Sequence, residues 1–125
     1  MRTVEAGLIG DAVRRLFIGA NIDLPDGVRR ALERARELET WAPAIGVLKT
    51  LEENSNTAQR LGIPICQDTG MACVFLDIGS EVFVDGDIAA AVDDGVARAC
   101  REGYLRASVV SDPLRRENTG DNTPA

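Results

Sequence analysis

The sequence predicts an α+β fold in which N-terminal helices are followed by a strand hairpin, a further helix and a polar loop. Three observations support this prediction. Apolar residues recur at helical spacing in the first half of the chain, an apolar run of strand length occupies residues 71–78, and helical spacing returns after residue 87. This order of elements favours an α+β domain over a sheet of alternating parallel strands and helices.

Three helices are expected in the first half of the chain. Apolar residues spaced three or four apart predict the first helix over residues 3–18. A second, charge-rich helix is expected over residues 28–38. Pro43 suits the first turn of a third helix, which Gly62 and Pro64 should end.

The second half should contain the strands and a fourth helix. Residues 71–78 form an apolar run that predicts a strand covered on both faces, and residues 81–84 predict the returning strand of a hairpin. Residues 85–87 offer turn and N-cap chemistry for the fourth helix, and Gly103 is placed to provide a left-handed C-cap.

The last part of the chain is polar. Val109 and Val110 predict a short strand, and the residues from Pro113 onward have the composition of a structured loop. Residues 119–125 end in a turn with nothing after it to pack against. We therefore expect the fold to be part of a larger domain, of which residues 1–125 are a truncated N-terminal portion.

Composition and charge exclude several classes of function. Among the 125 residues, 20 Asp and Glu outnumber 14 Lys and Arg, and the net charge of −6 opposes binding to a nucleic-acid backbone. The longest apolar stretches are far shorter than the roughly 20 residues of a membrane span. No histidine is present, so the chain alone cannot build Ser-His-Asp or Cys-His pairs or histidine-containing zinc sites.

The cysteines and the N-terminus indicate the compartment. Residues 1–10 contain neither an apolar leader core nor a small-residue cleavage site, so a cytoplasmic location is expected. Three cysteines are an odd number in an acidic chain, which argues against a disulfide framework and predicts free thiols.

The segment CQDTG at residues 66–70 concentrates a thiol, an amide, a carboxylate and a hydroxyl group. A Cys66 thiolate is a soft ligand for iron, and Asp68 can exchange a proton if its surroundings tune its pKa. A buried structural thiol followed by an Asx turn is the plainer interpretation, because free cysteine is among the most buried residue types. The residues alone leave both interpretations open.

Three motifs together resemble one family. They are IPICQDTG at residues 63–70, GYLRAS at 103–108 and DPLRRENTGDNTPA at 112–125. Their order and approximate spacing are similar to those of the iron-sulfur-dependent (class I) fumarate hydratases and the L(+)-tartrate dehydratase alpha subunits. The resemblance covers nearly the whole chain, so residues 1–125 are expected to be the N-terminal portion of the iron-sulfur catalytic domain of this family.

The resemblance implies an active site that is shared with residues outside this chain. In the family, three cysteines hold a 4Fe-4S cluster that leaves one iron open to the substrate, and Cys66 corresponds to the first of these ligands. Gln67 and Arg106 correspond to substrate-binding residues, and Asp68 to a catalytic residue that contacts the substrate hydroxyl or assists its protonation. Cys73 and Cys100 match no family motif, and both are expected in ordinary core environments.

Alternatives remain for the polar candidates. Asp68 could instead cap a turn, and Arg106 could be a surface arginine paired with an acidic residue. Arg115, Arg116 and the turn at residues 118–122 could line an anion-receptive loop or only stabilise the loop itself.

The implied activity is a hydro-lyase reaction that adds water to, or removes it from, a four-carbon dicarboxylate such as fumarate or malate. A tartrate dehydratase alpha subunit is the nearest alternative, and a non-catalytic truncated assembly module of the same fold is the alternative from another class. A redox role for Cys66 is disfavoured because no Cys-x-x-Cys partner follows it. The expected partners are the dicarboxylate substrate, the C-terminal domain or beta subunit of the same enzyme, and a second copy in a dimeric assembly.

Overall fold

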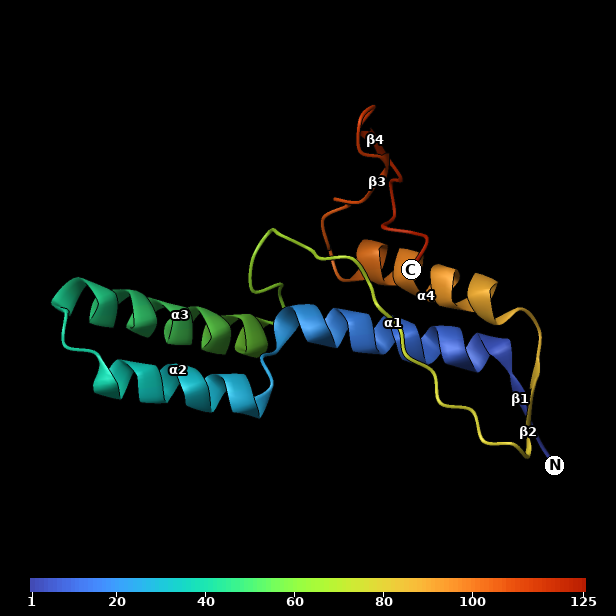
Figure 1. Ribbon diagram of the computed structural model, residues 1–125, viewed down its shortest axis with the longest axis horizontal. Helices are drawn as coiled ribbons and strands as arrows, with labels where there is room; N and C mark the ends of the chain where they lie inside the picture. Colours follow the sequence, from blue (N-terminus) through green and yellow to red (C-terminus); the bar gives the residue numbers. More distant parts are fainter.

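The computed structural model describes residues 1–125 and contains two pairs of packed helices (Figure 1). Helix α1 (Ala6–Ile22) packs against α4 (Ile88–Glu102). Helix α2 (Asp26–Leu38) packs against α3 (Ala42–Leu61), and this second pair extends away from the first as a helical hairpin. None of the helices combines the length and the apolar character needed to cross a membrane.

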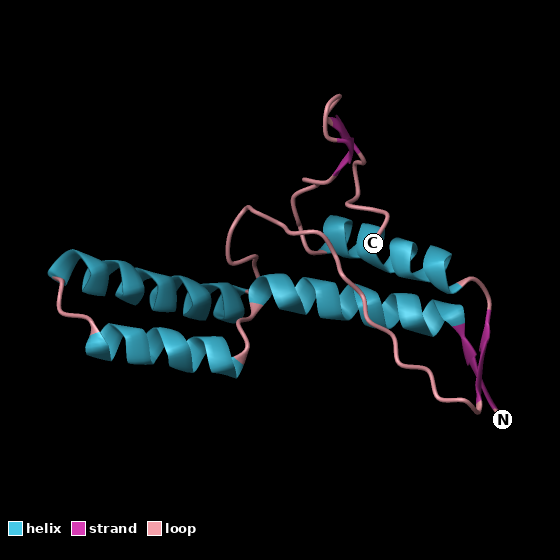
Figure 2. Ribbon diagram, in the orientation of Figure 1, coloured by secondary structure: helices cyan, strands magenta, loops and turns pink.

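The strands form two small sheets, drawn in magenta in Figure 2. Strand β1 (Arg2–Glu5) runs parallel to β2 (Val82–Asp85), with Arg2 opposite Val82 and Glu5 opposite Asp85. Strand β3 (Val110–Asp112) pairs antiparallel with β4 (Glu117–Asn118) in the C-terminal segment. The mixed α+β class predicted from the sequence is confirmed, as is a short strand near residues 109–110.

The predicted hairpin between residues 71–78 and 81–84 is wrong. Residues 71–78 are extended, but they form no backbone hydrogen bond and lie across α1 (Figure 1). Strand β2 pairs instead with β1, which belongs to the stretch predicted as the start of the first helix. The β-branched pair Thr3 and Val4 suits this strand, and the helix that follows runs on to Ile22. Strand pairing depends on contacts between residues far apart in the sequence, and local periodicity carries no information about these contacts.

The helix caps follow the sequence signals at three of four positions. Asp87 caps α4 by accepting a hydrogen bond from the Ala90 N–H at 3.0 Å, and Gly62 ends α3 with a φ of 65°. Pro43 lies in the first turn of α3, as predicted. The prediction for Gly103 is wrong, because its φ is −87° and Tyr104 takes the left-handed conformation at 54°.

Close packing explains why a glycine is nevertheless needed at position 103. A Cβ atom there would lie 3.0 Å from Ile18 Cγ1 of α1 and 2.9 Å from the Ala99 carbonyl oxygen. The chain turns one residue later, where Leu105 N–H donates to the Cys100 carbonyl at 3.0 Å and the Leu105 side chain is buried. Gly103 is therefore needed for the close packing of α4 on α1, and the strained left-handed backbone conformation falls on Tyr104.

The core lies between α1 and α4 and is small. Only 15 of the 125 residues are buried, so much of the apolar surface of this chain remains exposed. Cys100 is buried, as predicted, whereas Cys73 is exposed, and its predicted core environment is therefore wrong. Cys73 is exposed because it belongs to residues 71–78, which no second layer of structure covers. The members of the core cluster are Val13, Val92, Val96, Cys100 and Leu105.

Candidate functional site

The loop that carries Cys66 begins at a fixed point between two helices. After Gly62 ends α3, the Ile65 N–H donates to the Asn21 carbonyl of α1 at 2.9 Å. The Ile65 carbonyl in turn accepts from the Asn54 side-chain amide of α3 at 2.8 Å. Both main-chain groups of the residue before Cys66 are therefore held, one by α1 and one by α3.

Thr69 provides the second fixed point of the same loop. Its side chain is buried, and its Oγ1 accepts from the Arg106 backbone N–H at 3.0 Å. Its carbonyl oxygen accepts from the Ser108 hydroxyl at 2.5 Å. These two bonds join residues 66–70 to residues 103–108, so the structure brings Arg106 beside the loop of Cys66.

The predicted site residues between and beside these anchors all face solvent. Cys66, Gln67, Asp68 and Arg106 are exposed. Apart from a weak contact from Cys66 Sγ to the Asp68 carbonyl at 3.7 Å, their side chains make no hydrogen bond or ion pair within the chain. The plainer alternatives of a buried thiol, a turn-capping carboxylate and a paired surface arginine are therefore wrong for this structure. The functional roles of these residues stay predictions.

Asn122 attaches the third motif to the second. It is almost fully buried, at 1% exposure, and it adopts a left-handed φ of 62°. Its Oδ1 accepts from the N–H groups of Ser108 at 2.7 Å and Val109 at 3.0 Å, and its Nδ2 donates to the Arg106 carbonyl at 2.9 Å. Nδ2 also lies 3.4 Å from Cys100 Sγ. Burial raises the pKa of the Cys100 thiol, and this contact only partly opposes the effect.

The polar turn of the third motif is stabilised by its own side chains. Asn118 donates to the Ala107 carbonyl at 2.9 Å and accepts from the Gly120 N–H at 2.7 Å. Asp121 accepts from the Thr123 hydroxyl at 2.7 Å and from its N–H at 3.1 Å, and these bonds lower the pKa of the Asp121 carboxyl. Of the two interpretations left open for residues 118–122, these contacts favour loop stabilisation.

Sequence reasoning missed the positioning roles of Thr69 and Asn122. Both lie inside the quoted motifs, but the sequence does not show which backbone groups need a partner. Asparagine tolerates a left-handed φ, and its place in a polar turn that contains Gly120 was the available signal for Asn122. No such signal distinguishes Thr69 from any other threonine near a glycine.

The residues of this chain fit one ligand position of a thiolate-bound metal centre. Nowhere does the structure bring three or more potential metal-ligating side chains together. Cys66 is an exposed thiol on an anchored loop, whereas Cys100 is buried beside Asn122. Because no three such side chains come together, a soft metal centre that takes several thiolates would need ligands from outside this chain as well.

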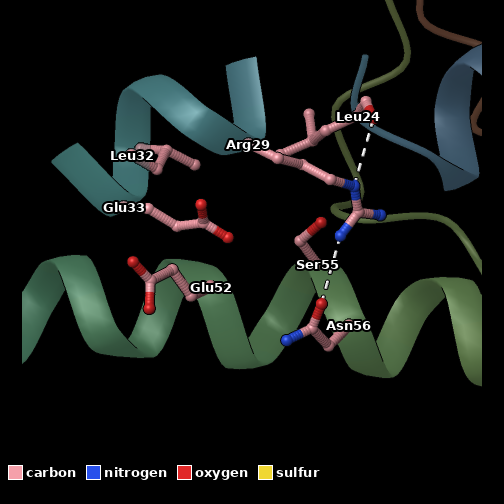
Figure 3. A pocket seen from close by; sticks show the side chains of 7 residues that line it. All are labelled: Leu24, Arg29, Leu32, Glu33, Glu52, Ser55 and Asn56. Atoms are coloured by element: carbon pink, nitrogen blue, oxygen red, sulfur yellow. Dashed lines mark hydrogen bonds between the residues drawn. The ribbon is translucent and has the colours of Figure 1, made fainter. Parts of the chain in front are cut away.

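A separate polar pocket lies between α2 and α3 and belongs to the helical hairpin (Figure 3). Arg29 reaches across it, donating to the Leu24 carbonyl at 3.2 Å and to Asn56 Oδ1 at 3.1 Å. The buried Ser55 hydroxyl has no hydrogen-bond partner there. The cavity of about 60 Å³ is large enough to hold water, and no residue of the three motifs lines it.

The structure therefore holds the exposed loop of Cys66, Gln67 and Asp68 beside the segment that carries Arg106. Residues 10–125 match the family described as fumarate hydratase (fumerase). This chain belongs to that family. The family predicted from the three motifs is confirmed.

Individual relatives carry two kinds of name. The chain is 40% identical over 116 residues to a provisionally named L(+)-tartrate dehydratase subunit alpha from Methanocaldococcus jannaschii. It is 31% identical over 115 residues to a provisionally named class I fumarate hydratase from Geobacillus stearothermophilus. It is also 30% identical over 100 residues to the L(+)-tartrate dehydratase subunit alpha of Escherichia coli.

These relatives are much longer than this chain. The alignments cover 91%, 90% and 80% of this chain, but only 40%, 22% and 33% of the respective relatives. The chain thus corresponds to less than half of each of these proteins.

Proposed function

We propose that this chain supplies the first cluster ligand and part of the substrate site of an iron-sulfur hydro-lyase. The reaction is the reversible addition of water to a four-carbon dicarboxylate, with fumarate and malate as the pair. The observation that carries the proposal is the loop of Cys66, which is anchored at Ile65 and Thr69 while the residues between the anchors remain exposed.

Each exposed group of the loop suits one task in this reaction. Cys66 would hold one iron of a 4Fe-4S cluster, which when bound supplies a Lewis acid for the substrate hydroxyl. The Arg106 guanidinium presents two parallel donors that match a carboxylate. Gln67 can donate a hydrogen bond to a second carboxylate oxygen, and Asp68 can accept or return the proton of the hydroxyl group.

The anchors explain how Arg106 is kept in place. Its N–H donates to Thr69 and its carbonyl accepts from Asn122, so both main-chain groups of the residue are used. The guanidinium remains without an acidic partner. An arginine with a fixed backbone and a free side chain loses less entropy on binding an anion than one on a mobile loop.

Tartrate is the second candidate substrate, because two of the relatives reported above are named as tartrate dehydratase alpha subunits. Fumarase and tartrate dehydratase chemistry differ by one substrate hydroxyl, which a site can select by a single hydrogen bond. The complete enzyme should be assayed with malate, fumarate and L-tartrate. Turnover of tartrate alone would assign the second activity and reject the first.

The remaining parts of the site would come from the C-terminal domain or a beta subunit of the same enzyme, in a dimeric assembly. The names of the tartrate dehydratase relatives specify a subunit alpha. The proposed compartment is the cytoplasm, where two exposed free thiols would stay reduced.

Replacing Cys66 by serine in the complete enzyme tests the ligand assignment. The Cys66→Ser enzyme should lose the absorbance of the cluster and its turnover, because serine is a poor ligand for a soft iron-sulfur centre. Cys73→Ser is the matched control, since Cys73 is also an exposed thiol. A full cluster in the Cys66→Ser enzyme would refute the assignment.

Two further substitutions separate binding from chemistry. Arg106→Lys should raise the KM for the dicarboxylate, because lysine lacks the planar pair of donors, while the exposed Arg60→Lys should not. Asp68→Asn should lower kcat and leave the cluster intact. If both variants turn over as the wild type does while the Cys66→Ser enzyme also retains its activity, the non-catalytic assembly module becomes the better account.

A further inference from the structure

The segment of residues 71–78 has the composition of a buried strand but lacks a strand partner. Its sequence, MACVFLDI, contains one charged residue. No backbone N–H or carbonyl group of the segment takes part in a backbone hydrogen bond. Apolar runs of this kind are typical of strands covered on both faces, and unpaired edges of this kind accept another strand.

One side of this segment already rests on the helices. Ala72 packs against the α1–α4 core, and Val74 lies between two apolar grooves that the segment forms with α1. These grooves have volumes of about 220 and 230 Å³, and only hydrophobic residues line them. Two residues of the segment are largely uncovered: Met71 is 74% exposed, and Phe75 is 94% exposed although it lines both grooves. Val74, Leu76 and Ile78 are less exposed, at 36%, 45% and 44%, so exposure alternates along the segment as in a strand with one layer missing.

We propose that residues 71–78 form a docking strand, paired in the assembled enzyme by an apolar β-strand from the polypeptide that completes the Cys66 site. This inference rests on the proposed function, because that polypeptide is the one that brings the remaining cluster ligands.

Two observations favour this occupant over a second copy of the chain. The docking strand begins five residues after Cys66, so a polypeptide that reaches the exposed thiol also reaches the strand. In addition, this chain covers at most 40% of the length of the relatives compared above, so the family contains more polypeptide than these helices. A strand added from that part would use the free backbone groups and fill the two grooves on α1.

Hydrogen–deuterium exchange of the complete enzyme tests the pairing directly. The amides of residues 72–78 should exchange much more slowly than the same amides in the urea-denatured enzyme. Exchange at the denatured rate in the folded enzyme would overturn the proposal. Slow exchange in a homodimer of this chain alone, identified by light scattering, would assign the strand to a second copy and would also overturn it.

Phe75→Asp provides the second measurement. Phe75 is too exposed for the change to unfold this chain. If the partner strand buries this phenylalanine, aspartate should weaken association with the polypeptide that completes the Cys66 site by roughly 10- to 100-fold. Leu114→Asp is the matched control, since Leu114 is 92% exposed at the tip of the β3–β4 turn. Equal assembly of both variants, measured by analytical ultracentrifugation, would overturn the proposal.

Neither measurement depends on turnover or on a bound cluster. An enzyme that protects residues 72–78 but converts neither malate nor tartrate keeps the docking strand and refutes the proposed function. An active enzyme with unprotected amides keeps the function and refutes the docking strand.

Discussion

Gly95 is the position where α4 comes closest to α1, and alanine there should destabilise the fold. A Cβ atom at Gly95 would lie 2.5 Å from the Gly10 carbonyl oxygen and 3.0 Å from Val13 Cβ. Real Cβ atoms essentially never approach other atoms to under 3.0 Å, so the two helices would have to separate by about the 0.5 Å difference. The blocking atom belongs to the backbone of α1 and cannot rotate away.

The size of the effect follows from two opposing contributions. Alanine is favoured over glycine in a helix interior by about 1 kcal/mol. A gap of 0.5 Å forfeits about a quarter of each van der Waals contact across the interface, and overpacked cores lose about 1–3 kcal/mol. This interface contains the core cluster of Val13, Val92 and Val96. The net expectation is that Gly95→Ala lowers the free energy of unfolding by up to about 2 kcal/mol.

Urea denaturation followed by circular dichroism measures this change. Gly46→Ala is the control, because Gly46 lies within α3 and a Cβ atom there meets nothing within 4 Å. The control should raise the free energy of unfolding by about 0.5–1 kcal/mol. If Gly95→Ala stabilised the protein as the control does, the close packing of α1 and α4 would be wrong.

Three further outcomes follow from the polar contacts. Cys100 should resist alkylation in mildly alkaline solution while Cys66 reacts, because burial raises the pKa of Cys100; equal labelling by mass spectrometry would contradict this. A hydrogen bond and the charge of Arg98 lower the pKa of Asp11, so their contribution to stability is present above the ordinary carboxyl pKa and is lost as the pH falls through the lowered value. Asp11→Asn should remove this part of the acid dependence of the urea midpoint, and an unchanged profile would exclude it. Asn122→Ala should cost about 2–4 kcal/mol in urea denaturation, because two N–H groups and a carbonyl lose their partner; a cost below about 0.5 kcal/mol would show that water replaces the amide.

The helices were predictable because their signals are local. Charge-rich α2 and the proline and glycine at the ends of α3 mark their own boundaries. Strand pairing was not predictable, because β1 and β2 lie about 80 residues apart and the local sequence of neither strand indicates which strand pairs with it. The hairpin prediction failed for the same reason, since residues 71–78 have a strand composition whose partner is absent from the sequence around them.

In the candidate site, too, the residues were predictable from local motifs but the contacts between segments were not. Cys66, Gln67, Asp68 and Arg106 were identified from motifs, and the structure joins their two segments through Thr69. Each of these bonds joins a side-chain hydroxyl to a backbone group, and since every residue carries such backbone groups, the sequence does not specify which one is the partner.

Under the proposed function, the contacts around Cys66 would order this chain's part of the site before the remaining polypeptide binds. The loop is held at Ile65 by α1 and α3, and at Thr69 by the segment that Asn122 braces. None of these bonds uses the side chains of the four candidate site residues, to which the proposal assigns metal and substrate binding. The entropy of ordering the loop is therefore lost during folding of this chain and not during assembly, which favours tighter binding of whatever completes the site.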